Sequence, residues 1–165
     1  MILAVAIATV TFLSTSVLHL SILHRLARRM DGRRRPRLAV WVGTFGLIGL
    51  LHVVEAGFYA SALKSAQTLD LGGFASAGAH SSWMDTYYFA LVSYTSLGLG
   101  DIYPTGHLRL IAGVASLNGF LLISCSAALL FRMVNRSEGH TDPSPASSMR
   151  RPPTIPGRKR RDPAT

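Results

Sequence analysis

Three long apolar runs constrain the fold of this 165-residue chain more than any other feature. They cover residues 2–23, 38–60 and 110–131, and Glu55 is the only Asp, Glu, Lys or Arg within them. Each run is about 22 residues long, which at helical rise is enough to cross the hydrocarbon core of a bilayer. Blocks of this length do not suit a soluble core. The sequence therefore predicts an all-α membrane protein with three transmembrane helices.

The placement of charge predicts how these spans are oriented. The net charge is +9, and arginines gather between residues 25 and 37 and again from residue 150 onward. The segment 61–106, between the second and third spans, carries only four charged residues. Because short basic loops stay in the cytoplasm, we expect a multi-pass plasma-membrane protein with its N-terminus outside and its C-terminus inside. The first span has no positive charge before it, so we interpret it as a retained anchor rather than a signal peptide.

A glycine-rich segment follows a short aromatic stretch: Thr95-Ser96-Leu97-Gly98-Leu99-Gly100-Asp101. Two glycines spaced two apart can adopt backbone angles closed to other residues, so consecutive carbonyls can point to the same side. Stacked rings of such oxygens can replace the water around a bare cation. The order of elements in this region resembles the pore module of bacterial two-transmembrane potassium channels. That order is a short helix, the pattern T-[ST]-x-G-x-G-D, the pair Tyr-Pro and then a membrane helix.

This resemblance covers roughly residues 38–136 and implies that Thr95 to Asp101 is the selectivity filter. It implies potassium at the Ser96 hydroxyl and at the carbonyls of Leu97, Gly98 and Leu99, with no cofactor beyond the permeant ion. Each chain supplies one pore loop, so four chains are needed to complete a filter. The implied function is a potassium-selective channel that conducts passively as a homotetramer, not an enzyme.

The filter departs from the family pattern at two positions. Ser96 replaces the usual threonine, and Leu99 replaces the usual tyrosine. The family's tyrosine hydroxyl bonds to an aromatic cuff, which Tyr88 and Phe89 match here, and leucine cannot make this bond. We therefore expect a softer filter that passes measurable sodium or inactivates readily. Tyr88 is predicted to donate a hydrogen bond to Asp101, with an oxygen-to-oxygen distance of about 2.5 to 3.0 Å.

Glu55 is an ionisable residue inside a span, which is rare and usually functional. We expect it to support the filter through a hydrogen bond to Ser93 or Tyr94, in preference to a role in proton transport. His52, one helical turn away on the same face, is the alternative local partner. His19, near the inner end of the first span, is assigned no role.

The third span is interpreted, on the same resemblance, as the pore-lining inner helix. Gly119 falls at the family's hinge glycine, where flexing could open a cytoplasmic gate. Gly113, Ser116 and Gly119 are spaced three apart, so close helix packing is an alternative that does not exclude the hinge. Four residues at helical spacing after the hinge are expected to line the cavity: Phe120, Ile123, Ala127 and Phe131.

The predicted organisation follows the spans. It comprises an N-terminal transmembrane helix (residues 1–24), a basic cytoplasmic linker (25–37), an outer transmembrane helix (38–60), an extracytoplasmic loop with pore helix and filter (61–106), the inner helix (107–133) and a disordered basic tail (134–165). Within the extracytoplasmic segment, residues 61–82 are expected to form a loop. The pore helix would then begin at Trp83, with Ser81 or Ser82 as its N-cap.

The partners expected from composition are lipids. The basic tail and the stretch Arg25–Arg37 would contact anionic headgroups, at about 1 kcal/mol per charge near the surface. Nucleic acid is not expected as a partner, because the basic clusters belong to a membrane-embedded body and the tail has no aromatic residues. Cys125 is the only cysteine, so it cannot form an intrachain disulfide, and it is expected to be a buried thiol.

Two other functions stay open. Gly98-Leu99-Gly100-Asp101 matches the G-x-G-D signature of a class of intramembrane aspartyl proteases. Those enzymes need a second aspartate on a membrane helix, and none of the three spans contains an aspartate. The other alternative is a non-conducting, pore-like accessory subunit.

Overall fold

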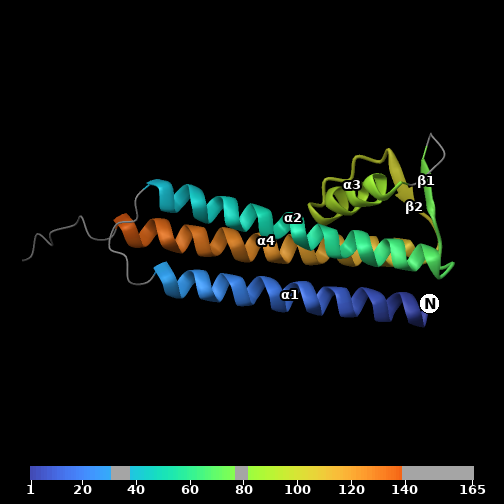
Figure 1. The fold of residues 1–165 in the computed structure, drawn as a ribbon, viewed down its shortest axis with the longest axis horizontal. Helices are drawn as coiled ribbons and strands as arrows, with labels where there is room; N and C mark the ends of the chain where they lie inside the picture. The colour runs from blue at the N-terminus through green and yellow to red at the C-terminus, as the bar shows by residue number, and fades with distance from the viewer. Residues whose placement is uncertain (31–37, 77–81, 139–165) are drawn as a thin grey trace, which may run out of the picture.

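The computed structural model describes residues 1–30, 38–76 and 82–138. Three long helices lie side by side in it: α1 (Ile2–Met30), α2 (Leu38–Thr68) and α4 (Leu108–Glu138), as Figure 1 shows. None of them contains proline, so the backbone hydrogen bonding of each continues without interruption. Each is long and apolar enough to cross a membrane. The predicted all-α membrane fold with three spans is confirmed.

The helices extend beyond the apolar runs that predicted them. The expectation that residues 61–68 form a loop is wrong, because α2 continues to Thr68. Ala62, Leu63 and Ala66 are strong helix formers, and all three are buried. α1 likewise continues to Met30, into the stretch expected to be a linker, and α4 continues to Glu138. The remaining linker residues 31–37 and the tail beyond residue 138 lie outside the described residues.

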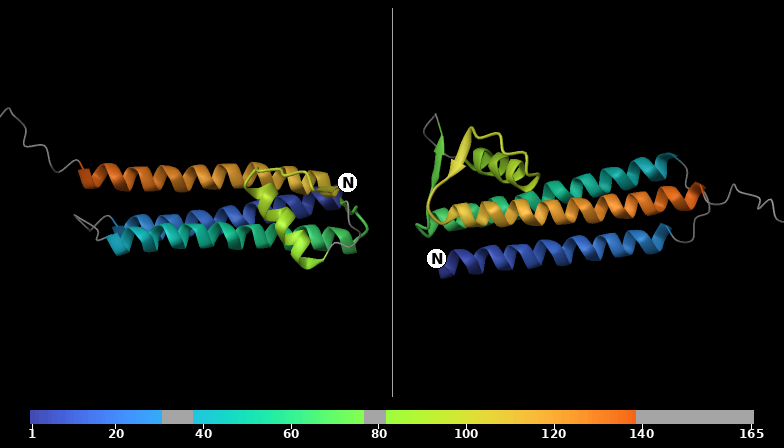
Figure 2. Two further views of the ribbon diagram at one scale, coloured as in Figure 1. Left: turned by 90° about the horizontal axis from the view of Figure 1, so that it is seen from above. Right: turned by 180° about the vertical axis from the view of Figure 1, so that it is seen from behind.

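A short helix, α3 (Trp83–Tyr94), lies against α2 and α4 on the side away from α1 (Figures 1 and 2). The predicted N-cap Ser82 is confirmed: its hydroxyl accepts the Asp85 N–H, and the Asp85 carboxylate accepts the Ser82 N–H at 2.9 Å. These bonds hold the pKa of Asp85 below its usual range. The helices can approach closely because fully buried alanines, Ala56 and Ala60 on α2 and Ala90 on α3, form much of the contact.

A small antiparallel ribbon joins the outer segments. β1 (Phe74–Ser76) pairs with β2 (Ile102–Pro104), with Ala75 opposite Tyr103. The ribbon is extended by a hydrogen bond from the Thr105 N–H to the Gly73 carbonyl at 2.7 Å. It therefore fixes the exit from the glycine-rich segment next to the chain that leaves α2. The sequence did not predict this ribbon, because three-residue strands are too short to show a period-2 pattern.

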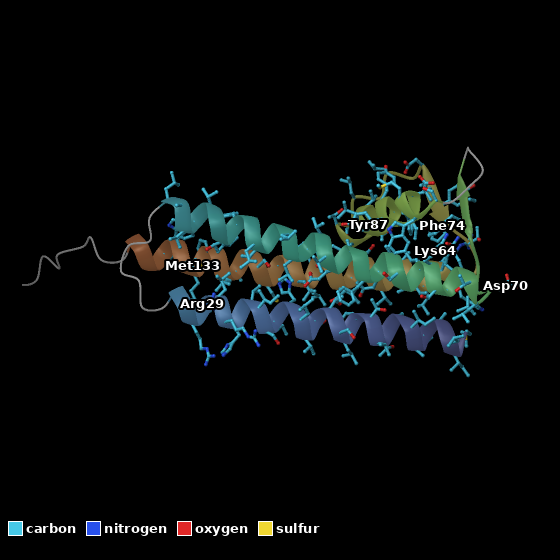
Figure 3. The ribbon with its side chains drawn as sticks, viewed as in Figure 1. Arg29, Lys64, Asp70, Phe74, Tyr87 and Met133 are labelled. Atoms are coloured by element: carbon cyan, nitrogen blue, oxygen red, sulfur yellow. The ribbon has the colours of Figure 1, made fainter. Side chains whose placement is uncertain are left out.

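The N-terminus and the arginines of α1 lie at opposite ends of the helical body, and the orientation of the chain in a membrane stays a prediction. Arg29 lies at one end of the helical body and Asp70 at the other (Figure 3). The N-terminal amino group lies 3.3 Å from His107 Nε2, so the start of α1 is at the same end as the ribbon. The N-terminus and the described part of segment 61–106 therefore share one end of the molecule, and Arg25, Arg28 and Arg29 lie toward the other.

Polar contacts attach α1 to the other two long helices. The Asn118 side chain on α4 donates hydrogen bonds to Thr15 Oγ1 on α1 at 2.6 Å and to the Tyr59 hydroxyl on α2 at 2.9 Å. All three residues are fully buried. In an apolar environment such bonds fix the rotation of each helix, because the alternative is an unsatisfied polar group. α1 is thus an integral part of the folded body.

Candidate functional site

Residues 95–101, here called the glycine segment, leave α3 through a tight C-terminal turn. The Leu97 N–H donates to the Val92 carbonyl at 3.0 Å and the Ser96 N–H to the Ser93 carbonyl at 2.9 Å, the bonding of a Schellman motif. The motif needs a left-handed residue, and Ser96 fills it with φ of 59° although it is not glycine. Ser96, the first left-handed residue of the glycine segment, therefore belongs to the turn that ends α3.

The backbone of the glycine segment alternates in handedness. Positive φ angles occur at Ser96 (59°), Gly98 (57°) and Gly100 (80°), with Leu97 and Leu99 between them outside that region. A strand with uniform angles points successive carbonyls to opposite sides, whereas alternation of handedness allows them to share a side. The two glycines occupy the positions where a side chain would be strained. The backbone thus has the conformation that the glycine spacing predicted.

Within one chain the glycine segment is not covered by other residues. All its residues are exposed, and the side chains of Leu97 and Leu99 are 64% and 58% exposed. A Cβ built on Gly98 or Gly100 would meet no atom within 4 Å. Within one chain, therefore, the need for glycine at these positions comes from φ and not from crowding.

The α3 end of the glycine segment rests on α4. Ser116 Oγ donates to the Ser93 carbonyl at 2.7 Å, and a Cβ on Gly119 would overlap the Tyr94 carbonyl oxygen. Gly119 therefore permits the close approach of α3 to α4, which is the packing alternative that the sequence left open. α4 runs as a continuous helix through Gly119. Its action as a hinge stays a prediction.

The other end of the glycine segment is held by Tyr88. The Tyr88 hydroxyl donates to Asp101 Oδ2 at 2.9 Å, which confirms the predicted contact. Accepting this bond, the Asp101 carboxylate raises the pKa of Tyr88, so the phenol stays protonated to higher pH than usual. Phe89, the other predicted cuff residue, is buried and packs its ring against Phe74 of β1 with centroids 4.9 Å apart.

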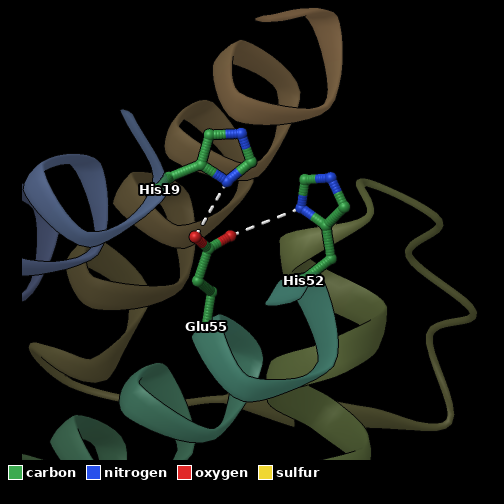
Figure 4. A group of neighbouring side chains, drawn as sticks. All are labelled: His19, His52 and Glu55. Carbon is green, nitrogen blue, oxygen red and sulfur yellow. Dashed lines mark hydrogen bonds and ion pairs between the residues drawn. The ribbon is translucent and has the colours of Figure 1, made fainter. Parts of the chain in front are cut away.

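Glu55 lies in a group of five side chains that we call the buried polar cluster: His19, His52, Glu55, Tyr94 and Ser126. The Tyr94 hydroxyl donates to Glu55 Oε2 at 2.6 Å, so the predicted bond to Tyr94 is confirmed. His52 Nδ1 lies 3.3 Å from the same carboxylate oxygen, so the local partner is also present (Figure 4). Because Tyr94 is the last residue of α3, this cluster fixes the side chain directly before the glycine segment.

Sequence reasoning missed the third partner of Glu55. His19 on α1 is fully buried, and its Nδ1 lies 2.9 Å from Glu55 Oε1 (Figure 4). On the far side, Ser126 Oγ lies 3.1 Å from His19 Nε2 and 3.3 Å from His52 Nε2. A signal for this contact existed: a buried carboxylate requires donors, and a histidine in another span is a candidate.

The residues predicted to line a cavity share one face of α4. Phe120, Ile123, Ala127 and Phe131 are all exposed in the single chain. Their exposure leaves a face available to other chains or to lipid, and the lining role stays a prediction. The expectation of a buried Cys125 is wrong, since this residue is exposed on α4. It is the residue immediately before buried Ser126, and because successive residues of a helix are about 100° apart around the axis, its side chain points in a different direction from that of Ser126.

Comparison with known proteins supplies the family. A family model described as an ion channel, the two-transmembrane pore-loop type, matches residues 43–136, which is more than half of the chain. The chain belongs to this ion channel family. The match spans α3, the glycine segment and the described α2 and α4 from Gly43 to Arg136, and leaves α1 outside. No match was found among curated proteins or solved structures.

Proposed function

We propose that this ion channel is selective for potassium and that the glycine segment is its filter. The observation that carries the proposal is the alternation of positive φ at Ser96, Gly98 and Gly100. This backbone allows the carbonyls of Leu97, Gly98 and Leu99 to form stacked rings, with the Ser96 hydroxyl as the innermost oxygen. Such uncharged oxygens can replace the hydration shell of potassium, and no cofactor is required.

We propose further that the conducting unit is a homotetramer. One chain supplies one glycine segment, so it can surround an ion on one side only. The exposure of residues 95–101 and of Phe120, Ile123 and Phe131 supports an assembly in which these surfaces meet other copies. α3 would then be the re-entrant pore helix, and its negative C-terminal end would favour a cation below the filter.

The proposed topology has the N-terminus outside the plasma membrane. It is supported by the arginines at the end of α1 opposite the glycine segment, because basic loops stay in the cytoplasm. Arg25, Arg28 and Arg29 would then reach anionic lipid of the inner leaflet. The remaining basic residues of this proposal, 33–37 and 150–161, lie outside the described residues.

The test is reconstitution of the purified full chain in liposomes loaded with potassium. We expect potassium flux above that of empty liposomes, together with a mass of four chains per detergent-solubilised particle by light scattering. Absence of flux from a tetrameric preparation would overturn the conduction proposal and leave the accessory-subunit alternative. A protease would instead cleave a membrane substrate and lose that activity in Asp101→Asn, with no flux in either protein.

A further inference from the structure

The buried polar cluster brings together the side-chain types that bind transition metals. One ligand atom from each of His19, His52 and Glu55 lies within 4.8 Å of the others. His19 and Glu55 are fully buried, and the His52 side chain is 16% exposed. The histidines come from different helices, α1 and α2, and both rings turn toward the carboxylate (Figure 4). Two imidazoles and a carboxylate form a donor set suited to zinc and unlike the all-oxygen sets of potassium, calcium or magnesium.

Ser126 contacts both histidines on the side of their rings that faces away from Glu55. Both Nε2 atoms approach the same Ser126 hydroxyl oxygen, at 3.1 and 3.3 Å. A hydroxyl oxygen has two lone pairs, so it can accept an N–H from each ring. With the protons on Nε2, both Nδ1 atoms direct lone pairs at the Glu55 carboxylate. Metal-ligating histidines almost always donate their other N–H to a carboxylate, a backbone carbonyl or water, and here the Ser126 hydroxyl would accept in their place.

In these tautomers the centre of the cluster has more lone pairs than protons. His19 Nδ1 lies 2.9 Å from Glu55 Oε1, and His52 Nδ1 lies 3.3 Å from Glu55 Oε2. The O–H that faces the carboxylate belongs to Tyr94, which bonds Glu55 Oε2 at 2.6 Å and lies 2.9 Å from His52 Nδ1. One hydroxyl proton cannot serve both contacts. A cation at the centre would satisfy all of them.

We propose that His19 Nδ1, His52 Nδ1 and the Glu55 carboxylate bind a divalent transition-metal ion of the zinc type, with a water molecule as fourth ligand. The Tyr94 hydroxyl would keep its hydrogen bond to Glu55 and so orient the carboxylate. Metal bonds of 2.0 to 2.1 Å at tetrahedral angles place ligand atoms about 3.3 Å apart. The two nitrogen-to-carboxylate distances, 2.9 and 3.3 Å, are close to this separation. The ion would join α1 to α2. This site is independent of the filter and of the ion that the channel conducts.

A cavity lies near the cluster, although no residue of the cluster lines it. It has a volume of about 560 Å³ and lies between α1 and α4, one helical turn from His19 and next to Ser126 in the sequence. Its lining includes His24 and Cys125, which are metal-binding residue types.

The site is tested by zinc titration of the purified full chain in detergent, without an affinity tag and after chelator treatment. Calorimetry should show one zinc ion per chain. We expect His19→Gln, His52→Gln and Glu55→Gln each to weaken binding about 100-fold or more, and Ser126→Ala, which keeps every ligand, to weaken it about 10-fold. The matched control is His107→Gln, an exposed histidine at the other end of the molecule, which should bind zinc as the wild type does.

The visible absorption of bound cobalt tests the wild-type chain directly, so the proposal can be contradicted even if the ligand variants do not fold. Cobalt bound to the wild-type chain should give the intense visible absorption of a tetrahedral nitrogen and oxygen site, which zinc should abolish by displacement. Failure of the wild type to bind zinc stoichiometrically, a six-coordinate cobalt spectrum, or equal binding by folded ligand variants would each overturn the proposal. The cluster would then be a network held by protons alone.

Discussion

The glycine segment and the buried polar cluster are built in opposite ways. The glycine segment uses backbone conformation, and within one chain its residues are exposed and a Cβ on Gly98 or Gly100 would touch nothing. The cluster uses side chains, and the contacts of Glu55 with His19, His52 and Tyr94 are all made within one chain. The comparison teaches that one chain completes the contacts of the side-chain cluster but leaves the glycine segment exposed, which is what the proposed tetrameric filter requires.

The largest expected effect is at Gly98. Gly98→Ala places a Cβ on a residue with φ of 57°, which costs about 1 to 3 kcal/mol per chain and turns carbonyls out of line. Potassium flux into liposomes should fall to the level of empty liposomes, while membrane insertion and folding persist. Gly43→Ala is the control, since a Cβ there also meets no atom but the backbone is helical. Undiminished flux in Gly98→Ala would sink the filter assignment.

The next largest effect is expected at Gly119, where α3 contacts α4. Gly119→Ala forces a Cβ into the Tyr94 carbonyl, so α3 must move, which we expect to destabilise the fold by about 1 to 3 kcal/mol and to reduce flux. Gly113→Ala on the same helix meets nothing within 4 Å and should be neutral or slightly stabilising. Thermal unfolding in detergent measures both. Equal stability of the two variants would show that α3 does not rest on Gly119.

The cluster side of the comparison is tested at Tyr94. Tyr94→Phe keeps the ring but removes the hydroxyl that donates to buried Glu55, so the free energy of unfolding should fall by about 1 to 3 kcal/mol. Tyr103→Phe, at a residue that is 54% exposed, should change it little. Chemical unfolding followed by circular dichroism gives the comparison. If the two substitutions cost the same, the Tyr94 bond contributes nothing to stability.

The smallest expected effect is at Tyr88. Tyr88→Phe removes the hydrogen bond to Asp101 and should speed the decay of current during sustained opening without abolishing conduction. Because the folded pKa of Tyr88 is raised, the contribution of this bond is present below the ordinary tyrosine pKa and is lost as pH rises through the folded value. Current recordings at neutral pH compare the decay rates of wild type and variant. Identical rates would show that Tyr88 contributes packing only and that its hydrogen bond has no role in current decay.

Features encoded by local pattern could be predicted from the sequence. The three spans followed from apolar length, and the left-handed residues Gly98 and Gly100 followed from glycine spacing. The Ser82 cap of α3 followed from its place before an amphipathic stretch. The Glu55–Tyr94 bond also could be predicted, because a buried carboxylate needs donors and the depth of Glu55 was known from helical rise.

Features that depend on tertiary packing could not be predicted from the sequence. His19 lies 36 residues before Glu55, and no periodicity reports that the two helices bring them together. The ribbon of β1 and β2 is too short to leave a pattern, and the burial of Ala62 and Leu63 that extends α2 depends on the tertiary contacts. At Gly119 the sequence allowed both hinge and close packing, and only the position of the Tyr94 carbonyl establishes the packing.

The most direct test of potassium selectivity is the reversal potential with potassium on one side of a bilayer and sodium on the other. We predict a large wild-type potential, negative on the potassium side, that is limited by a measurable sodium permeability, because Leu99 lacks the hydroxyl that would restrain the proposed filter at about 1 kcal/mol per chain. Leu99→Tyr should move the potential further from zero. A wild-type reversal potential of zero would contradict the account.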